Sequence, residues 1–195
     1  MNLKENKYRK KQEAIINAAE HLFLKYGYGA TTMDAIAEVA QVTKQTVYRY
    51  FSSKKNLFTT LIQREKESTK TFYFGDGSIH NELQMYAKAF ITFHMHPKRL
   101  GLYQLMISES RAHPEIAEIF IEQAQPTWKP ILINYLKEKL MCGDNSEIYA
   151  EMFNAYLLHV RPAILMGLLQ PPTDQEVNHS AEVATTLFLQ GVLAH

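Results

Sequence analysis

The chain has 195 residues, one cysteine and a formal net charge of +1, and 46% of its residues are hydrophobic. This length suits one large or two small domains with a core that needs no disulfide, which argues against a small secreted scaffold. No apolar run is long enough to span a bilayer, and an amphipathic segment rather than a signal peptide follows the basic first eleven residues. We therefore expect a soluble, cytoplasmic protein without a membrane anchor.

The charge is distributed unevenly along the chain. Residues 1–60 contain ten lysines and arginines against five acidic residues, a net charge of +5, whereas residues 61–195 have a net charge of −4. A basic N-terminal third favours a polyanionic partner for that part of the chain. Much of this charge belongs to a basic arm over residues 4–11.

Apolar residues recur at helical spacing from the start of the chain, and no alternating strand pattern interrupts them. Gly27 and Gly29 end the first helix, and Thr32 is placed to cap the second. Glycines at positions 75 and 77 end the helix that begins near Ser53. We predict the first helices over residues 15–26, 32–40, 44–50 and 53–73.

The helical pattern continues to the C-terminus. Asp144 with Glu147, and Thr173 with Glu176, have the spacing of capping boxes, and Pro162 is expected to kink the helix that contains it. We predict the later helices over residues 83–93, 97–109, 114 onward, 128–141, 145–168 and 174–193. The prediction is an all-α fold of about nine helices, with a helix-turn-helix domain over residues 1–56 and a helical ligand-binding and dimerisation domain over residues 57–195.

The stretch "AEVAQVTKQTVYRYFSSKKNLF" places two short helices on either side of a three-residue break. This is the geometry of a helix-turn-helix, whose second helix enters the major groove of DNA. Lysine can donate to guanine and glutamine can pair with adenine, while phenols and guanidinium groups reach phosphates. The candidate DNA-binding residues are Thr32, Thr43, Lys44, Gln45, Thr46, Tyr48, Arg49, Tyr50 and Lys54. A bihelical turn also occurs in proteins that bind no nucleic acid, so pattern and charge alone leave a solvated basic helix as the alternative.

Residues 9–58 resemble the N-terminal domain of TetR-type transcriptional regulators. They contain "IINAAEHLF…GY", "TTMDAIA" and "VTKQTVYRYFSSKKNL" in the order and at the spacing of that family. The resemblance implies that Thr32, Tyr48, Tyr50 and Lys54 contact phosphates and that Thr43 and Lys44 begin the recognition helix. The family often has Gly or Pro at the position of Gln45 and His at that of Arg49, so base preference stays open. Residues 102–120 are similar to the ligand domain of the AefR-like or AcrR-like subgroup.

The C-terminal part offers a candidate pocket and a candidate dimer surface. Ligand pockets are mostly apolar, and methionine adapts to varied ligands, although aromatic stripes also form ordinary cores. The candidate pocket residues are Tyr86, Phe90, Phe93, Tyr103, Met106, Trp128, Met152, Phe153 and Tyr156. The resemblance implies a homodimer held by the last two long helices. The candidate dimer residues are Ile148, Met152, Ala181, Ala184, Leu187, Phe188 and Gly191.

These features predict a homodimeric repressor that reads a pseudo-palindromic double-stranded DNA operator and is released by a small apolar or amphipathic effector. Two alternatives stay open. One is a DNA-binding regulator without an effector, and the other is a helical small-molecule-binding protein whose helix-turn-helix domain, called the head below, is non-functional. His94 and His96 project about 200° apart on a helix, so we expect no metal site. No nucleotide-binding or nucleophile motif is present, so we expect neither an enzyme nor a cofactor.

Overall fold

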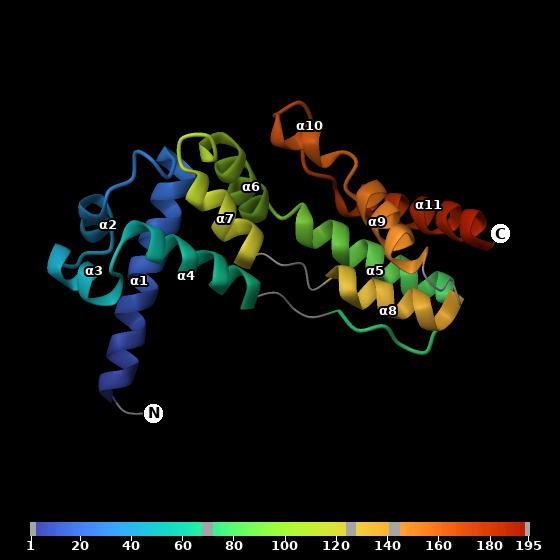
Figure 1. Cartoon of the computed structure of the whole chain (residues 1–195), viewed down its shortest axis with the longest axis horizontal. Helices are drawn as coiled ribbons and strands as arrows, with labels where there is room; N and C mark the ends of the chain where they lie inside the picture. Colours follow the sequence, from blue (N-terminus) through green and yellow to red (C-terminus); the bar gives the residue numbers. More distant parts are fainter. Residues whose placement is uncertain (1–2, 68–71, 124–127, 141–144, 194–195) are drawn as a thin grey trace. The chain divides into compact units, whose positions relative to one another are not determined.

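The computed structural model describes residues 3–67, 72–123, 128–140 and 145–193. These residues form eleven α-helices and no strand, which confirms the all-α prediction. The helices, drawn in Figure 1, are α1 Leu3–Tyr26, α2 Met33–Val39, α3 Lys44–Tyr50, α4 Lys54–Glu67, α5 Ile79–His94, α6 Pro97–Glu109, α7 Pro114–Gln123, α8 Trp128–Leu140, α9 Ser146–Leu157, α10 Arg161–Leu165 and α11 Asp174–Leu193.

The first helix begins earlier than predicted, at Leu3 rather than at residue 15, and two other predicted helices end earlier than expected. The segment 145–168 is not one kinked helix, because α9 ends at Leu157 and Pro162 lies in the first turn of a separate short helix, α10. Amides in the first turn of a helix have no partner within the helix, so the missing N–H of proline costs nothing there. Proline therefore begins a helix more readily than it continues one. The helix expected to reach Tyr73 does not, since residues 72–74 are not helical and Phe74 stacks on Tyr135 instead.

The capping predictions have different outcomes. Thr173 and Glu176 form a reciprocal capping box, because the Thr173 amide donates to the Glu176 carboxylate and the Glu176 amide donates to the Thr173 hydroxyl. The capping interaction predicted for Asp144, like the lone Cys142, lies outside the described residues.

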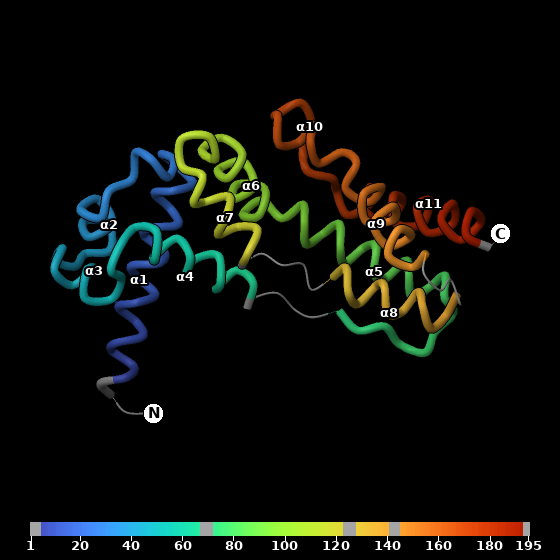
Figure 2. The backbone as a smooth tube through the Cα atoms, in the orientation of Figure 1, coloured from blue at the N-terminus to red at the C-terminus, as the bar shows by residue number. Residues whose placement is uncertain are grey.

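Contacts divide the chain into two compact units. Unit 1 is Met1–Thr69 with Gly101–Gln125, and unit 2 is Lys70–Leu100 with Pro126–His195. In unit 1, α7 packs along α4 (Figure 1), and α6 contributes Leu102 and Leu105 to the same core. In unit 2, α5 lies beside α9 and α11, and α8 packs against α9 (Figure 2). The predicted boundary after residue 56 separates a DNA-binding domain from a ligand-binding domain by function, not by packing. It therefore stays a prediction.

Each unit has its own apolar core. The core of unit 1 joins residues of α1, α2, α3 and α4 to Leu102 and Leu105 of α6 and to Ile116 and Ile119 of α7. The core of unit 2 is rich in aromatic side chains from α5, α8 and α9. Val47, the one fully buried residue described in α3, fixes the inner face of that helix and leaves its polar face outward.

Candidate functional site

The predicted recognition helix α3 begins at a well-formed cap. Thr43 has an extended backbone, and its hydroxyl accepts the amide of Thr46 at 3.2 Å. Thr32 caps α2 in the same way, accepting the amide of Ala35 at 3.1 Å. These bonds satisfy amides that a helix start otherwise leaves unpaired. Both threonines are therefore structural caps as well as candidate DNA contacts, and the latter role stays a prediction.

The turn between α2 and α3 is a Schellman motif. The amide of Val42 donates to the carbonyl of Ala37 at 3.0 Å, and the amide of Gln41 donates to that of Glu38 at 3.0 Å. Gln41 has a positive φ of 54°, the left-handed conformation that this motif requires and that glycine usually supplies. The turn thus directs the chain into α3 after only four residues.

The outward face of α3 presents several of the predicted DNA-binding side chains to solvent. Lys44, Gln45 and Arg49 are exposed, and Tyr48 is 47% exposed. Tyr50 is half-buried, and its ring packs on Tyr8 of the basic arm with centroids 4.4 Å apart. The Arg49 guanidinium lies 5.4 Å from the centre of the Tyr50 ring. Aromatic packing therefore links the basic arm, now part of α1, to the end of α3.

Lys44 has a partner that the sequence analysis missed. Its ammonium lies 2.8 Å from one carboxylate oxygen of Asp34 and 2.9 Å from the other, and Asp34 belongs to the first turn of α2. This hydrogen-bonded carboxylate raises the pKa of Lys44. Both side chains are about 60% exposed, so water screens the pair. A DNA phosphate or base approaching Lys44 has to compete with Asp34.

We predict that Asp34→Asn binds operator DNA about two- to fivefold more tightly, because it removes a negative charge beside Lys44 and frees the ammonium for DNA. Fluorescence anisotropy with a labelled duplex at fixed salt measures the change. Glu38→Gln, an exposed acid one turn along α2, is the matched control for general charge. Equal gains in both variants, or a weaker complex for Asp34→Asn, would contradict competition at Lys44.

Lys54 has a different environment from the one predicted. Its ammonium donates to the carbonyls of Tyr28, Gly29 and Thr31 at 2.7, 3.2 and 2.9 Å. These three bonds use all three of its hydrogens. Burial lowers its pKa, an effect opposed by Glu109 and by Glu115. Lys54 therefore clamps the loop between α1 and α2, and we no longer propose it as a phosphate contact.

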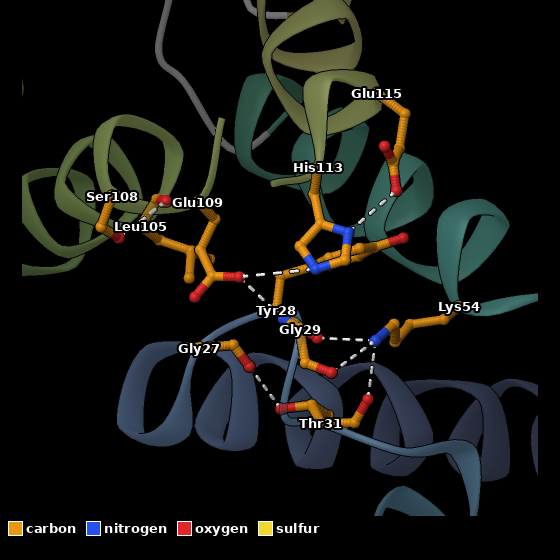
Figure 3. Close-up of polar contacts among 10 residues, drawn as sticks. All are labelled: Gly27, Tyr28, Gly29, Thr31, Lys54, Leu105, Ser108, Glu109, His113 and Glu115. Carbon is orange, nitrogen blue, oxygen red and sulfur yellow. Dashed lines mark hydrogen bonds and ion pairs between the residues drawn. The ribbon is translucent and has the colours of Figure 1, made fainter. Parts of the chain in front are cut away.

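The same loop is held from its other side by α6, a link with no signal in the sequence pattern. The Glu109 carboxylate accepts a hydrogen bond from the amide of Gly29 at 2.8 Å (Figure 3). His113 lies four residues further along the chain, in the turn before α7. Gly27 has a φ of +89°, and a Cβ there would lie 2.5 Å from a Glu109 oxygen. A Cβ on Gly29 would lie 2.7 Å from a His113 nitrogen. Gly27 thus makes room for Glu109 of α6, and Gly29 makes room for His113 in the turn between α6 and α7.

The predicted pocket residues do not form one cluster. Tyr103 and Met106 belong to α6 in unit 1, where the Tyr103 ring packs on Phe120. Met152 and Tyr156 are 62% and 45% exposed on α9. The remaining five lie in the core of unit 2: Tyr86, Phe90, Phe93, Trp128 and Phe153. The pocket prediction is therefore narrowed to these five.

The predicted dimer residues also separate into two groups. Ala181 and Ala184 are buried in the core of their own unit, so these two are not available to a partner. Phe188 is half-buried and packs against Phe153. Ile148, Met152 and Leu187 are 56%, 62% and 55% exposed. A Cβ on Gly191 would meet no atom within 4 Å.

Two family models match most of the chain. Residues 15–61 match the bacterial regulatory proteins of the tetR family. Residues 81–191, more than half of the chain, match the AefR-like transcriptional repressor C-terminal domain. The chain belongs to the TetR family. Members of this family are DNA-binding transcriptional regulators, not enzymes.

Relatives and solved structures of TetR-family members support this assignment along the whole chain. The chain is 25% identical over 195 residues to the uncharacterized HTH-type transcriptional regulator YvkB of Bacillus subtilis, covering 95% of this chain and 99% of the relative. The structure of the flavonoid-responsive regulator FrrA is 28% identical, with a TM-score of 0.76 over 93% of this chain and 96% of that one. A TetR-family regulator from Pseudomonas syringae, 24% identical over 93% and 96% of the two chains, shares the fold with a TM-score of 0.76.

Two further observations concern metal binding and membrane insertion. In the described part of the chain no three histidine, cysteine or acidic side chains lie close enough together to hold a metal ion. None of the helices described is both long enough and apolar enough to cross a membrane.

Proposed function

We propose that this TetR-family regulator is a homodimeric repressor that inserts α3 of each subunit into the major groove of a pseudo-palindromic operator. The observation that supports this most directly is the outward polar face of α3, with Lys44, Gln45 and Arg49 exposed and Val47 holding the opposite face in the core. Gln45 and Arg49 are the residues we propose for sequence selectivity. In this proposal Thr32, Tyr48 and Tyr50 contact phosphates, and Thr43, Lys44 and Thr46 face base edges beside Gln45.

The homodimer is proposed to form through the exposed apolar faces of α9 and α11. Ile148, Met152 and Tyr156 are spaced at i, i+4 and i+8, so they lie on one face of α9. Leu187 and Gly191 have the same spacing on α11. A contiguous apolar face is typical of a protein interface, and a glycine with open space above it allows a second helix to approach closely. We propose this face as the place where a second copy binds.

The effector is proposed to bind in unit 2, among the aromatic side chains of α5, α8 and α9. The solved structure named for its response to flavonoids belongs to a protein that is 28% identical over nearly all of this chain. By similarity we propose that this chain also responds to a small molecule. The effector acts by preferring the arrangement of the dimer that cannot engage both half-sites, since a ligand that binds both arrangements equally shifts nothing.

The test of the proposed DNA interface uses Lys44→Ala and Arg49→Ala with a duplex taken from the DNA upstream of the gene. Each variant is expected to bind about tenfold or more weakly than the parent, because each subunit loses one cationic contact. Lys137→Ala, an exposed lysine of α8 in unit 2, is the matched control and should bind like the parent. Unchanged affinity in both α3 variants would show that α3 is not the reading helix.

Adding candidate effectors to this DNA-binding assay, and to a thermal-unfolding assay, distinguishes the proposed function from a regulator without an effector. If a panel of lipophilic cations, acyl thioesters and aromatic acids leaves both the operator complex and the thermal midpoint unchanged, the alternative is favoured. If the DNA affinity is absent at every salt concentration, the head is non-functional and the third possibility, a small-molecule-binding helical protein, is favoured.

A further inference from the structure

Unit 2 contains buried polar groups whose hydrogen-bonding capacity is unmet. Neither ring nitrogen of His94 has a hydrogen-bond partner among the described residues, and the indole nitrogen of Trp128 has none. His94 is 8% exposed and Trp128 is 5% exposed. Buried polar groups are nearly always paired, and each unpaired one costs free energy of folding. Three such atoms in one aromatic cluster mark a place where a bound ligand or a water molecule would supply the missing partners.

The two residues face a common set of rings. Phe90 lies 4.4 Å from the His94 ring and 5.7 Å from the Trp128 ring, measured between centroids. Phe93 lies 5.0 Å from His94 and 5.4 Å from Trp128. The surroundings of both polar groups are thus two phenyl rings, and Tyr86 closes the cluster at 5.5 Å from Trp128. Such walls favour a flat aromatic ligand.

Two positively charged side chains, Arg99 and Arg161, act on this cluster. The guanidinium of Arg99 lies 3.5 Å from the centre of the Phe93 ring. Burial, together with the positive charges of Arg161 and Arg99, lowers the pKa of His94 to about 3. The imidazole is therefore neutral, with one nitrogen that donates and one that accepts. Two nearby guanidinium groups favour an anion over a cation in this place.

We propose that the effector is an aromatic acid or an acidic phenol, whose oxyanion accepts hydrogen bonds from the Trp128 indole and from His94 while its ring packs between Phe90 and Phe93. This deepens the proposed function, since it rests on unit 2 being the effector site. A hydroxyl on the same ring can donate to the second nitrogen of His94. Lipophilic cations are disfavoured by Arg99 and Arg161, and straight-chain acids lack the ring that the phenyl walls select. An enclosed water molecule is the competing occupant.

The test compares four probes on the full-length protein without DNA, using calorimetry and thermal shift. The probes are 2-naphthoate, its uncharged methyl ester, a naphthylmethyl trimethylammonium cation and decanoate. We expect 2-naphthoate to bind at least about tenfold more tightly than each of the others, because it alone combines the ring with the oxyanion. Equal or tighter binding of the ester, the cation or decanoate would overturn the proposal. So would the absence of naphthoate binding, which is the result expected if the cluster encloses only water.

Two variants test the assigned atoms. Trp128→Phe removes the indole N–H and keeps an aromatic ring, and it is expected to weaken naphthoate binding about tenfold or more. The matched control is Tyr135→Phe, which removes another unpartnered buried donor on the same helix, two turns or roughly 10 Å away. It should bind naphthoate like the parent. If Trp128→Phe does not fold, His94→Leu gives the same comparison, and parental affinity in the folded variant contradicts the proposal.

The outcome is separable from that of the proposed function. A protein that binds its operator but not naphthoate remains a DNA-binding regulator and loses only the effector class. If the naphthylmethyl trimethylammonium cation dissociates the operator complex, the protein responds to a ligand, but the proposed class of aromatic acids and acidic phenols is wrong. Loss of operator binding alone leaves the calorimetric comparison of the four probes unaffected.

Discussion

Met152→Glu is expected to yield a monomer that binds the operator at least about 100-fold more weakly than the parent protein. Met152 is 62% exposed in the middle of the apolar face of α9, between Ile148 and Tyr156. In the proposed homodimer a glutamate there would bury a charge against apolar side chains with no cation to pair it. The single head that remains then reads one half-site, and the gain from simultaneous binding at two half-sites is lost.

Sedimentation equilibrium measures the association state, and anisotropy with a full and a half operator measures the DNA affinity. Ile121→Glu is the matched control, because Ile121 is 68% exposed on α7 in unit 1 and lies outside the proposed face. It introduces the same charge at an equally exposed apolar site and should leave the dimer intact. A dimeric Met152→Glu protein would show that subunits associate through another surface.

His94→Leu is expected to remove a large part of the acid sensitivity of unit 2. The pKa of buried His94 is about 3, against an ordinary value of about 6.5. Between these values the unfolded chain binds a proton that the folded protein does not, so stability falls as the pH falls through this window. Well above pH 6.5 the His94 imidazole is neutral in both the folded and the unfolded state, so it does not make stability depend on pH there. When the pH is lowered from 6.5 to 4.5, the free energy of unfolding of the parent should fall by about 2 kcal/mol more than that of the variant.

Denaturant unfolding at the two pH values gives this difference directly. Trp128 is the single tryptophan of the chain and lies in the core of unit 2, so its fluorescence reports on that unit. His179→Leu, at an exposed position of α11, is the control and should keep the pH dependence of the parent. Identical pH dependence in the parent and in His94→Leu would mean that His94 is protonated at about its ordinary pH in the folded state.

The helices and the reading head were predictable because their signals are local. Caps, apolar spacing and the three-residue break depend on neighbours within four positions, and the structure confirms Thr32 as a cap. The division at Pro162 was harder to predict, since a proline in the first turn of a helix and a proline kink differ only in the backbone of the preceding residues. The aromatic run at 72–74 has a pattern that a helix and an extended segment share.

The site residues were less predictable because their contacts are distant in sequence. Nothing in the spacing indicates that Asp34 pairs with Lys44, or that the Lys54 ammonium is consumed by three carbonyls of an earlier loop. The exposed α9 stripe was assigned partly to a pocket, since Met152 and Tyr156 have the same periodicity whether they face a core or solvent. The unmet nitrogens of His94 become visible only when every neighbour is known.

The attachment of α6 and α7 to the head limits how this regulator can be rearranged. Leu102, Leu105, Ile116 and Ile119 complete the core of unit 1, and Glu109 fills the space above Gly27 and Gly29. A hybrid gene that joins residues 1–69 to the C-terminal part of a distant relative therefore separates surfaces that pack against one another in this protein. Recombination that exchanges operator preference between such proteins has to transfer the α6–α7 segment as well, or confine itself to the outward side chains of α3.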